Sequence, residues 1–216
     1  MKPANVVFKP IERRNRLAEL GLEEDGLQQC VARGQSAWAD CTPNHPAIFK
    51  GMSAWGETTC AVREYLLPKG WKRVDEGNLP TTVNKANTIT IIVSTGNEDT
   101  GRADGEPSTK SSKGPRTAEA IASNLMNTLF GDIRKIASKP DDRATYMLLF
   151  HRDEELEEVR CELSSPLKIN EDDGRIDEWT ERIILGSMPF DGGSKISTGN
   201  GPQTPDLNVE IRRRSG

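Results

Sequence analysis

TITIIVS, residues 88–94, runs into the long polar segment TGNEDTGRADGEPSTKSSKGPR, residues 95–116, and then into TAEAIASNLMNTLF, residues 117–130. Isoleucine and valine occupy both faces of the first segment, which predicts a strand that is covered on both sides. An apolar stripe from Ala118 to Leu129 predicts a helix over the third segment. This order places loop amides near a helix N-terminus, where ligand-contacting groups are common.

The connecting segment 95–116 is too long to be a simple link between a strand and a helix. It contains four glycines and two prolines and hardly an apolar side chain. We therefore expect it to contribute nothing to the core. We also expect a protease to cut first in this segment and in residues 186–206.

The other elements are expected to be short. Helices are expected over 12–20, 23–33 and 53–67, and strands over 71–74, 80–84, 144–151, 156–163 and 179–185. Residues 40–52 contain two prolines and a glycine and are expected to form a loop. The pattern predicts an α+β fold, with a mainly antiparallel sheet of about five or six strands and three or four helices packed on one side.

Composition divides the chain into two parts. Residues 1–185 are expected to form a single α+β domain. Residues 186–216 begin with a stretch rich in glycine and proline, which predicts a flexible linker. Alternating apolar residues over 207–211 then predict a possible final edge strand, and three arginines form a basic tail.

Charge and hydropathy exclude several classes of protein. The 216 residues carry a net charge of -4, so attraction to nucleic acid has to come from a local patch. The N-terminal stretch lacks the apolar region of a secretory signal, and no apolar run approaches the length that spans a bilayer. We therefore expect a cytoplasmic protein with no membrane contact.

The four cysteines do not form a metal-binding pattern. No two of them are spaced as a CxxC pair, and free thiols are expected in a cytoplasmic protein. Cys30, Cys41, His45 and Cys60 include the ligand types of a zinc site, but such sites bring their ligands in close pairs. We therefore assign no metal to this set.

The second half of segment 95–116 is basic. Lys110, Lys113 and Arg116 lead directly into the N-terminal end of the predicted helix. Cationic side chains, exposed amides and a helix dipole suit a phosphate group, so these residues are predicted to contact phosphate or nucleic acid. A P-loop is excluded because no Gly-Lys pair is present. Two alternatives remain open: a solvated surface loop, or a segment that orders only against a protein partner.

The hairpin over 144–163 contains the one enzyme-like pattern. Asp141 precedes its first strand, and Glu158 and Arg160 lie two apart on its second strand. This arrangement resembles the PD-(D/E)xK nuclease motif, and the resemblance implies carboxylates that hold Mg²⁺. Arginine stands where that motif has lysine, and the two are not interchangeable. We favour the alternative, in which the charged face of the hairpin is solvated.

The predicted function is non-enzymatic. Only His45 and His151 are available as histidine bases, and neither lies in a recognisable triad pattern. We expect a binding or assembly subunit of an intracellular complex that contacts a protein partner through segment 95–116, with nucleic acid as a possible further partner. No cofactor is expected. The competing prediction is an Mg²⁺-dependent nuclease that uses Asp141, Glu158 and Arg160.

Overall fold

A seven-stranded mixed sheet forms the centre of the computed structural model, which describes residues 3–130 and 143–190. The strands are β1 (Asn5–Val7), β2 (Lys72–Glu76), β3 (Leu79–Val83), β4 (Ile89–Thr95), β5 (Ala144–Asp153), β6 (Glu158–Lys168) and β7 (Glu178–Pro189). They lie in the order β1-β7-β6-β5-β4-β3-β2. The pairs β1–β7 and β4–β5 are parallel, and the other four pairs are antiparallel.

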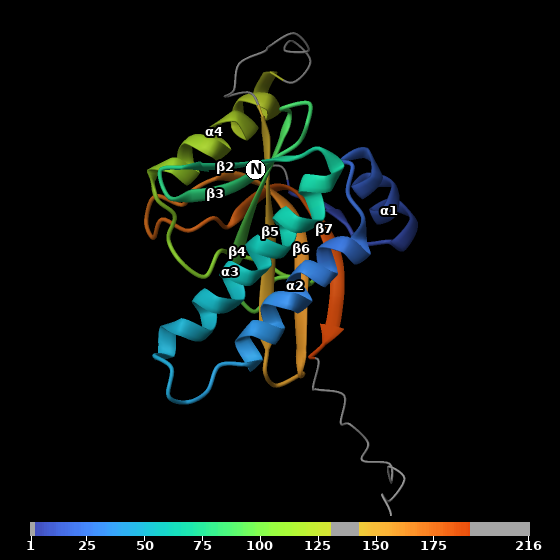
Figure 1. Cartoon of the computed structure of the whole chain (residues 1–216). Helices are drawn as coiled ribbons and strands as arrows, with labels where there is room; N and C mark the ends of the chain where they lie inside the picture. Colours follow the sequence, from blue (N-terminus) through green and yellow to red (C-terminus); the bar gives the residue numbers. More distant parts are fainter. Residues whose placement is uncertain (1–2, 131–142, 191–216) are drawn as a thin grey trace, which may run out of the picture.

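Helices cover both faces of this sheet (Figure 1). The helices are α1 (Pro10–Glu19), α2 (Glu24–Ala39), α3 (Ala47–Leu66), the short 3-10 helix η1 (Leu67–Lys69) and α4 (Pro115–Phe130). The first three α-helices bury the larger apolar cluster, which includes Leu27, Val62 and Leu148. A smaller cluster on the other face includes Ile121 of α4 together with Met147 and Leu149 of β5, because side chains alternate between the faces of a strand.

Residues 88–130 and β5 form a strand–helix–strand crossover. β4 leads through segment 96–114 into α4, which returns to the parallel strand β5 with Ile89 opposite Ala144. The predicted strand and helix are therefore confirmed. Parallel strands direct their carboxyl ends to the same edge of a sheet, and ligands of open α/β sheets bind outside those ends.

The α+β prediction is confirmed, with two differences in detail. The sheet has seven strands because the short parallel strand β1 joins one edge, and three residues leave little periodic signal in a sequence. The helices do not all pack on one side, since α4 packs against the face opposite α1–α3 (Figure 1). None of the helices in the described part of the chain is long and apolar enough to cross a membrane.

Several predicted boundaries are wrong. α2 ends at Ala39 rather than at residue 33, and β6 ends at Lys168 rather than at residue 163. α3 begins at Ala47 rather than Ser53, because Pro46 has an extended backbone and occupies the N-cap position. β7 continues to Pro189, so the first residues of the predicted linker pair with β6. The predicted edge strand over 207–211 and the basic tail lie outside the described residues.

Segment 95–116 is fastened to the sheet by a buried arginine. Arg160 of β6 donates from Nε to the carbonyl oxygen of Thr100 at 3.1 Å and from a terminal nitrogen to the carbonyl oxygen of Glu98 at 2.7 Å. Gly101 lies against Arg160 with φ +78, and a Cβ there would come within 2.7 Å of the Arg160 Cβ. A glycine is therefore required where the loop passes over β6.

A buried ion pair on the neighbouring strands holds the next part of the loop. Arg182 of β7 donates to the carbonyl oxygens of Gly105 at 2.7 Å and Arg102 at 2.8 Å. Arg182 also donates to both carboxylate oxygens of Glu162, and Glu162 accepts the backbone N–H of Gly101 at 2.8 Å. Each charge is thus compensated, as a buried charge has to be.

These contacts correct two expectations from the sequence. The loop does contribute to the interior, since Thr100 and Thr109 are 0% exposed and Trp179 donates from Nε1 to the carbonyl oxygen of Pro107. The charged face of β6 is not solvated, because the loop covers it: Glu162 is 0% exposed and Arg160 is 4% exposed. The alternation of apolar and charged residues along β6 predicts that the two faces of the strand differ. It does not predict whether the charged face is exposed to solvent.

Candidate functional site

The candidate site begins where the β3–β4 ladder ends. Pairing of these strands stops with Thr81 opposite Ile92, and the preceding residue of β3 is Pro80, which has no N–H to donate. Val93 O accepts instead from Nε1 of Trp55 on α3 at 3.1 Å. The β3 side of β4 is therefore open between Ile92 and Thr95, where α3 faces the loop that leads to α4. Pairing resumes at Thr95, whose carbonyl oxygen accepts from the Lys110 N–H of the loop at 3.0 Å.

A cavity of about 570 Å³ lies at this open edge. Its size is typical of a pocket for a small organic molecule. Apolar side chains form most of its wall, among them Trp38, Ile48, Met52, Trp55, Leu79, Ile92 and Met147. Its polar groups come from the end of β4, from the loop and from the first turn of α4, which contribute Ser94, Thr95, Lys110, Ser111, Lys113 and Thr117.

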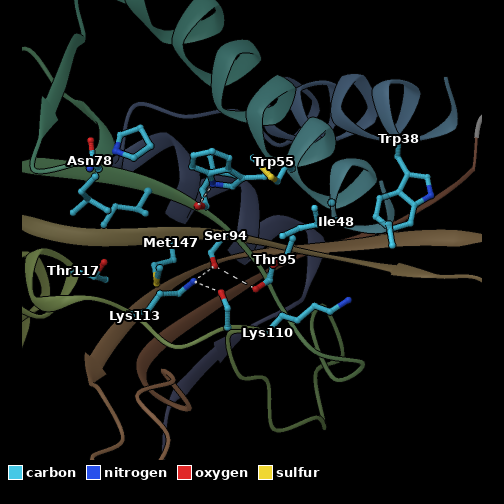
Figure 2. Close-up of a pocket in the computed structure, with 18 residues that line it drawn as sticks. Trp38, Ile48, Trp55, Asn78, Ser94, Thr95, Lys110, Lys113, Thr117 and Met147 are labelled. Carbon is cyan, nitrogen blue, oxygen red and sulfur yellow. Dashed lines mark hydrogen bonds between the residues drawn. The ribbon is translucent and has the colours of Figure 1, made fainter. Parts of the chain in front are cut away.

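Lys113 carries its amine into this cavity (Figure 2). Lys113 Nζ lies 2.8 Å from Ser94 Oγ and 3.5 Å from Ser111 Oγ. The lysine is held in place by its own backbone N–H, which donates to Gly174 O at 2.7 Å. Figure 2 shows Lys113 meeting Ser94 on the side of the cavity opposite Trp55.

The Lys113 amine is isolated from negative charge. No carboxylate lines the cavity, and no ion pair to Lys113 is present among residues 3–130 and 143–190. Burial without a counter-charge lowers the pKa of Lys113 to about 8. The amine is therefore mostly charged at pH 7 and mostly neutral at pH 9, within a largely apolar chamber.

The structure separates the three basic residues predicted to act together. Lys110 lines the same cavity as Lys113, and its amine points toward the end where Trp38 lies (Figure 2). Arg116 is exposed outside the cavity and pairs with Glu119 on its own helix at 2.9 Å. Lys110 and Lys113 are thus brought together at one site, and Arg116 is not part of it.

The residues of the nuclease-like pattern lie elsewhere. Asp141 falls outside the described residues. Glu158 accepts a hydrogen bond from Arg160 at 3.1 Å, and Arg160 also pairs with Asp153 at 2.8 Å. Arg160 is thereby engaged with two carboxylates and two loop carbonyls on the face that segment 95–116 covers.

Several cavity residues escaped the sequence analysis. Ser94 reads as an ordinary polar position at the end of a strand, and Ile48 and Met52 fall in a stretch predicted to be loop. One sequence feature, Pro80, could have indicated the open edge of the sheet, because a proline in a strand marks a point where the hydrogen-bond ladder stops.

The four cysteines are free thiols, and Cys30 and Cys161 are buried.

No model of a known protein family matches this chain, and no curated protein or solved structure is significantly similar to it. The chemistry of the cavity therefore has to identify the kind of ligand.

Proposed function

We propose that the protein binds a small organic anion, with an apolar body and one carboxylate or similar head group, in the cavity beside β4. The observation that carries this proposal is the Lys113 amine, which is partly buried in a largely apolar cavity, contacts two serine hydroxyls and has no carboxylate partner in the described chain. An anionic head group would supply the charge that the site lacks, in a setting where charge-assisted hydrogen bonds are strong. This proposal differs from the sequence prediction, which named a protein partner and a phosphate or nucleic-acid contact, and it retains only a binding role for Lys110 and Lys113.

The side chains that line the cavity indicate the chemical nature of the ligand's body, beyond its anionic head group. Ile48, Met52 and Trp55 lie at i, i+4 and i+7 along α3, so they line one face of the helix over the cavity. Aromatic and aliphatic walls favour an apolar chain or ring, while hydroxyl groups and the lysine orient the head group. Lys110 adds a second cation toward the Trp38 end of the chamber.

The probe for this proposal is 8-anilinonaphthalene-1-sulfonate, which joins an apolar body to an anion and fluoresces when it is desolvated. Binding should weaken as pH rises through about 8, because the Lys113 amine then loses its charge. Lys113→Met should weaken binding at pH 7 by about ten- to a hundredfold, the worth of one charge-assisted hydrogen bond. Octanoate should compete with the dye.

The matched control is Lys72→Met, on the exposed strand β2 and away from the cavity. It changes the net charge of the protein by the same amount and should leave the affinity unaltered. Equal affinity of the wild type and Lys113→Met at pH 7 would remove the lysine from the site and overturn the proposal.

A protein partner is the second proposal, and the exposed apolar side chains of α3 support it. Ile48 is 70% exposed and Met52 55% exposed, and Phe49 beside them is 42% exposed. Neighbouring exposed apolar residues commonly mark an interaction surface. Ile48→Asp with Met52→Asp should release a subunit that co-purifies with the native protein, whereas Leu156→Asp, at the exposed β5–β6 turn, should not.

Contact with nucleic acid through Lys110, Lys113 and Arg116 stays a prediction. A phosphate contact would lower log K linearly with log salt, with a slope of about 0.7 to 0.9 per phosphate. Replacing all three residues by alanine should reduce that slope by roughly two to three. Identical slopes for the two proteins would contradict the contact.

The nuclease alternative also stays a prediction. Incubation with Mg²⁺ and either DNA or RNA should give no cleavage if the β5–β6 hairpin is structural. Cleavage that is lost in Glu158→Ala would establish the alternative in its place.

A further inference from the structure

Ser94 and Lys113 form a nucleophile–base pair by their geometry. The hydroxyl oxygen and the amine nitrogen lie 2.8 Å apart, within the distance that proton transfer between two such groups requires. The charged amine donates to Ser94 Oγ, and the hydroxyl donates to Thr95 O at 3.2 Å, so the hydroxyl has to turn toward Lys113 once the amine is neutral. Both side chains line the cavity, and Ser94 is 3% exposed, so an ester has to enter deeply to reach the hydroxyl. We propose that Ser94, activated by Lys113, hydrolyses esters of apolar carboxylic acids in this cavity.

The surroundings of the pair favour a lysine that works as a base. Among the described residues, Lys110, a second cation, is the one other titratable side chain in the cavity wall, so no carboxylate of this part of the chain stabilises the charged form of the Lys113 amine. Burial lowers the Lys113 pKa to about 8, close to neutral pH, where a general base is most effective. Serine–lysine pairs act in this way on several unrelated folds.

The chemistry of the step balances within the site and one water molecule. Ser94 Oγ transfers its proton to Lys113 Nζ and bonds to the ester carbonyl carbon. The carbon–oxygen bond to the alcohol then breaks, and the alkoxide takes the proton from the lysine ammonium. Water, deprotonated by the same neutral amine, attacks the acyl-serine, and the bond between the acyl carbon and Ser94 Oγ breaks. Oγ takes the proton from the Lys113 ammonium, so the products are the carboxylic acid and a restored Ser94 hydroxyl.

The tetrahedral intermediate carries a negative oxygen that needs donors. Thr117, in the first turn of α4, and Ser111 line the same cavity and supply hydroxyl groups there. The N-terminal end of α4 adds a partial positive charge on this side of the site.

The substrate class follows from the walls and from the binding proposal, on which this inference partly rests. Trp55, Ile48 and Met52 suit an apolar acyl group, and the product of its hydrolysis is the amphiphilic carboxylate proposed as ligand. The two roles need opposite states of Lys113. Anion binding uses the charged amine and weakens above pH 8, whereas hydrolysis uses the neutral amine and accelerates there.

The test is hydrolysis of p-nitrophenyl butyrate by the full-length protein between pH 6 and 9.5, corrected for spontaneous hydrolysis. The rate should rise with pH and level off above about 8. Ser94→Ala should lose the enzymatic rate. Lys113→Arg, which keeps a cation but cannot act as a base at these pH values, should lower the rate by about 10²- to 10⁴-fold. Ser112→Ala, at an exposed residue outside the cavity wall, is the matched control and should keep the rate.

Covalent trapping identifies the nucleophile. A fluorophosphonate probe followed by peptide mapping should label Ser94 in the wild type and should fail to label Lys113→Met. Labelling at another residue, or hydrolysis retained in Ser94→Ala, would overturn the inference.

Dye binding separates this inference from the binding proposal. If Ser94→Ala and the wild type bind the anilinonaphthalene dye equally and neither hydrolyses the ester, the hydrolase inference fails and the binding proposal stands. If the ester is hydrolysed through Ser94 but the dye does not bind through Lys113, the binding proposal fails instead.

Discussion

Arg182 is a buried cation and Lys113 a partly buried one, and their surroundings are opposite. Arg182 donates to both oxygens of Glu162 and to two backbone carbonyls, so its charge is neutralised and its donors are used. Within residues 3–130 and 143–190, the Lys113 amine has hydrogen bonds to the hydroxyl groups of Ser94 and Ser111 and none to a carboxylate. One site is closed by its own partners, and the other lacks a charge that a ligand can supply.

The comparison teaches how to tell a structural charge from a functional one within a single molecule. A compensated buried pair fixes one backbone arrangement, here the path of segment 95–116 over β6 and β7. An uncompensated amine raises the free energy of the folded protein and survives where something else makes use of it. Burial of a charged side chain therefore does not by itself indicate a ligand-binding site. The informative property is that the buried charge has no oppositely charged partner.

The largest effect is expected on breaking the compensated pair. Glu162→Ala leaves Arg182 buried and unpaired and removes the acceptor of the Gly101 N–H, so it should lower the free energy of unfolding by about 3–5 kcal/mol. Denaturant titration measures the change. A loss below 1 kcal/mol would mean that the pair does not hold the loop.

Limited proteolysis provides a second measure of the same variant. Segment 95–116 in the wild type should resist cleavage because its backbone is bonded to Arg160 and Arg182. In Glu162→Ala it should be cut early. Early cleavage of this segment in the wild type would restore the original expectation of a mobile loop.

The intermediate effect tests the uncompensated amine. The folded-state pKa of Lys113, about 8, lies below its ordinary value of 10.5, so between these pH values the unfolded chain binds more protons. The free energy of unfolding of the wild type, relative to Lys113→Met, should therefore rise with pH over this window, by on the order of 2–3 kcal/mol. Below pH 8 the apolar variant should be the more stable protein. A difference that stays constant with pH would show that the amine is not desolvated.

The smallest effect is expected at Arg116, which is charged but neither buried nor part of the cavity. Its pair with Glu119 joins two exposed side chains on one helix, so Arg116→Ala should change the free energy of unfolding by less than about 0.5 kcal/mol. It should also leave dye binding unaltered. A loss of dye binding would place Arg116 in the site with the two lysines.

Local patterns predicted the elements around the site well. β4 is a short continuous apolar run, α4 carries a clear apolar stripe, and the strands over 144–151 and 156–163 correspond to β5 and β6. The basic half of the loop led to Lys110 and Lys113, because charge next to a helix N-terminus is visible in a sequence. These features depend on residues that are close along the chain.

What the sequence did not predict depends on distant residues. The strand alternation of Glu158, Arg160 and Glu162 suggests a wet face until Arg182, twenty residues beyond Glu162, is known to lie beside it. Ser94 becomes distinctive only because Lys113 returns to it across the loop. A pattern along one strand specifies which residues share a face, and only tertiary packing specifies what covers that face.

The fastening of the loop has a consequence for the order in which the protein folds. The carbonyl groups of Arg102 and Gly105 are bonded by Arg182, which follows them by 80 and 77 residues. Contacts of such separation carry a large loop-closure cost and tend to form after local structure. The path of Lys113 toward Ser94 is therefore completed only when β6 and β7 have joined the sheet. A molecule that occupies the finished chamber binds the native state alone, and its uptake during refolding would report the last step of assembly.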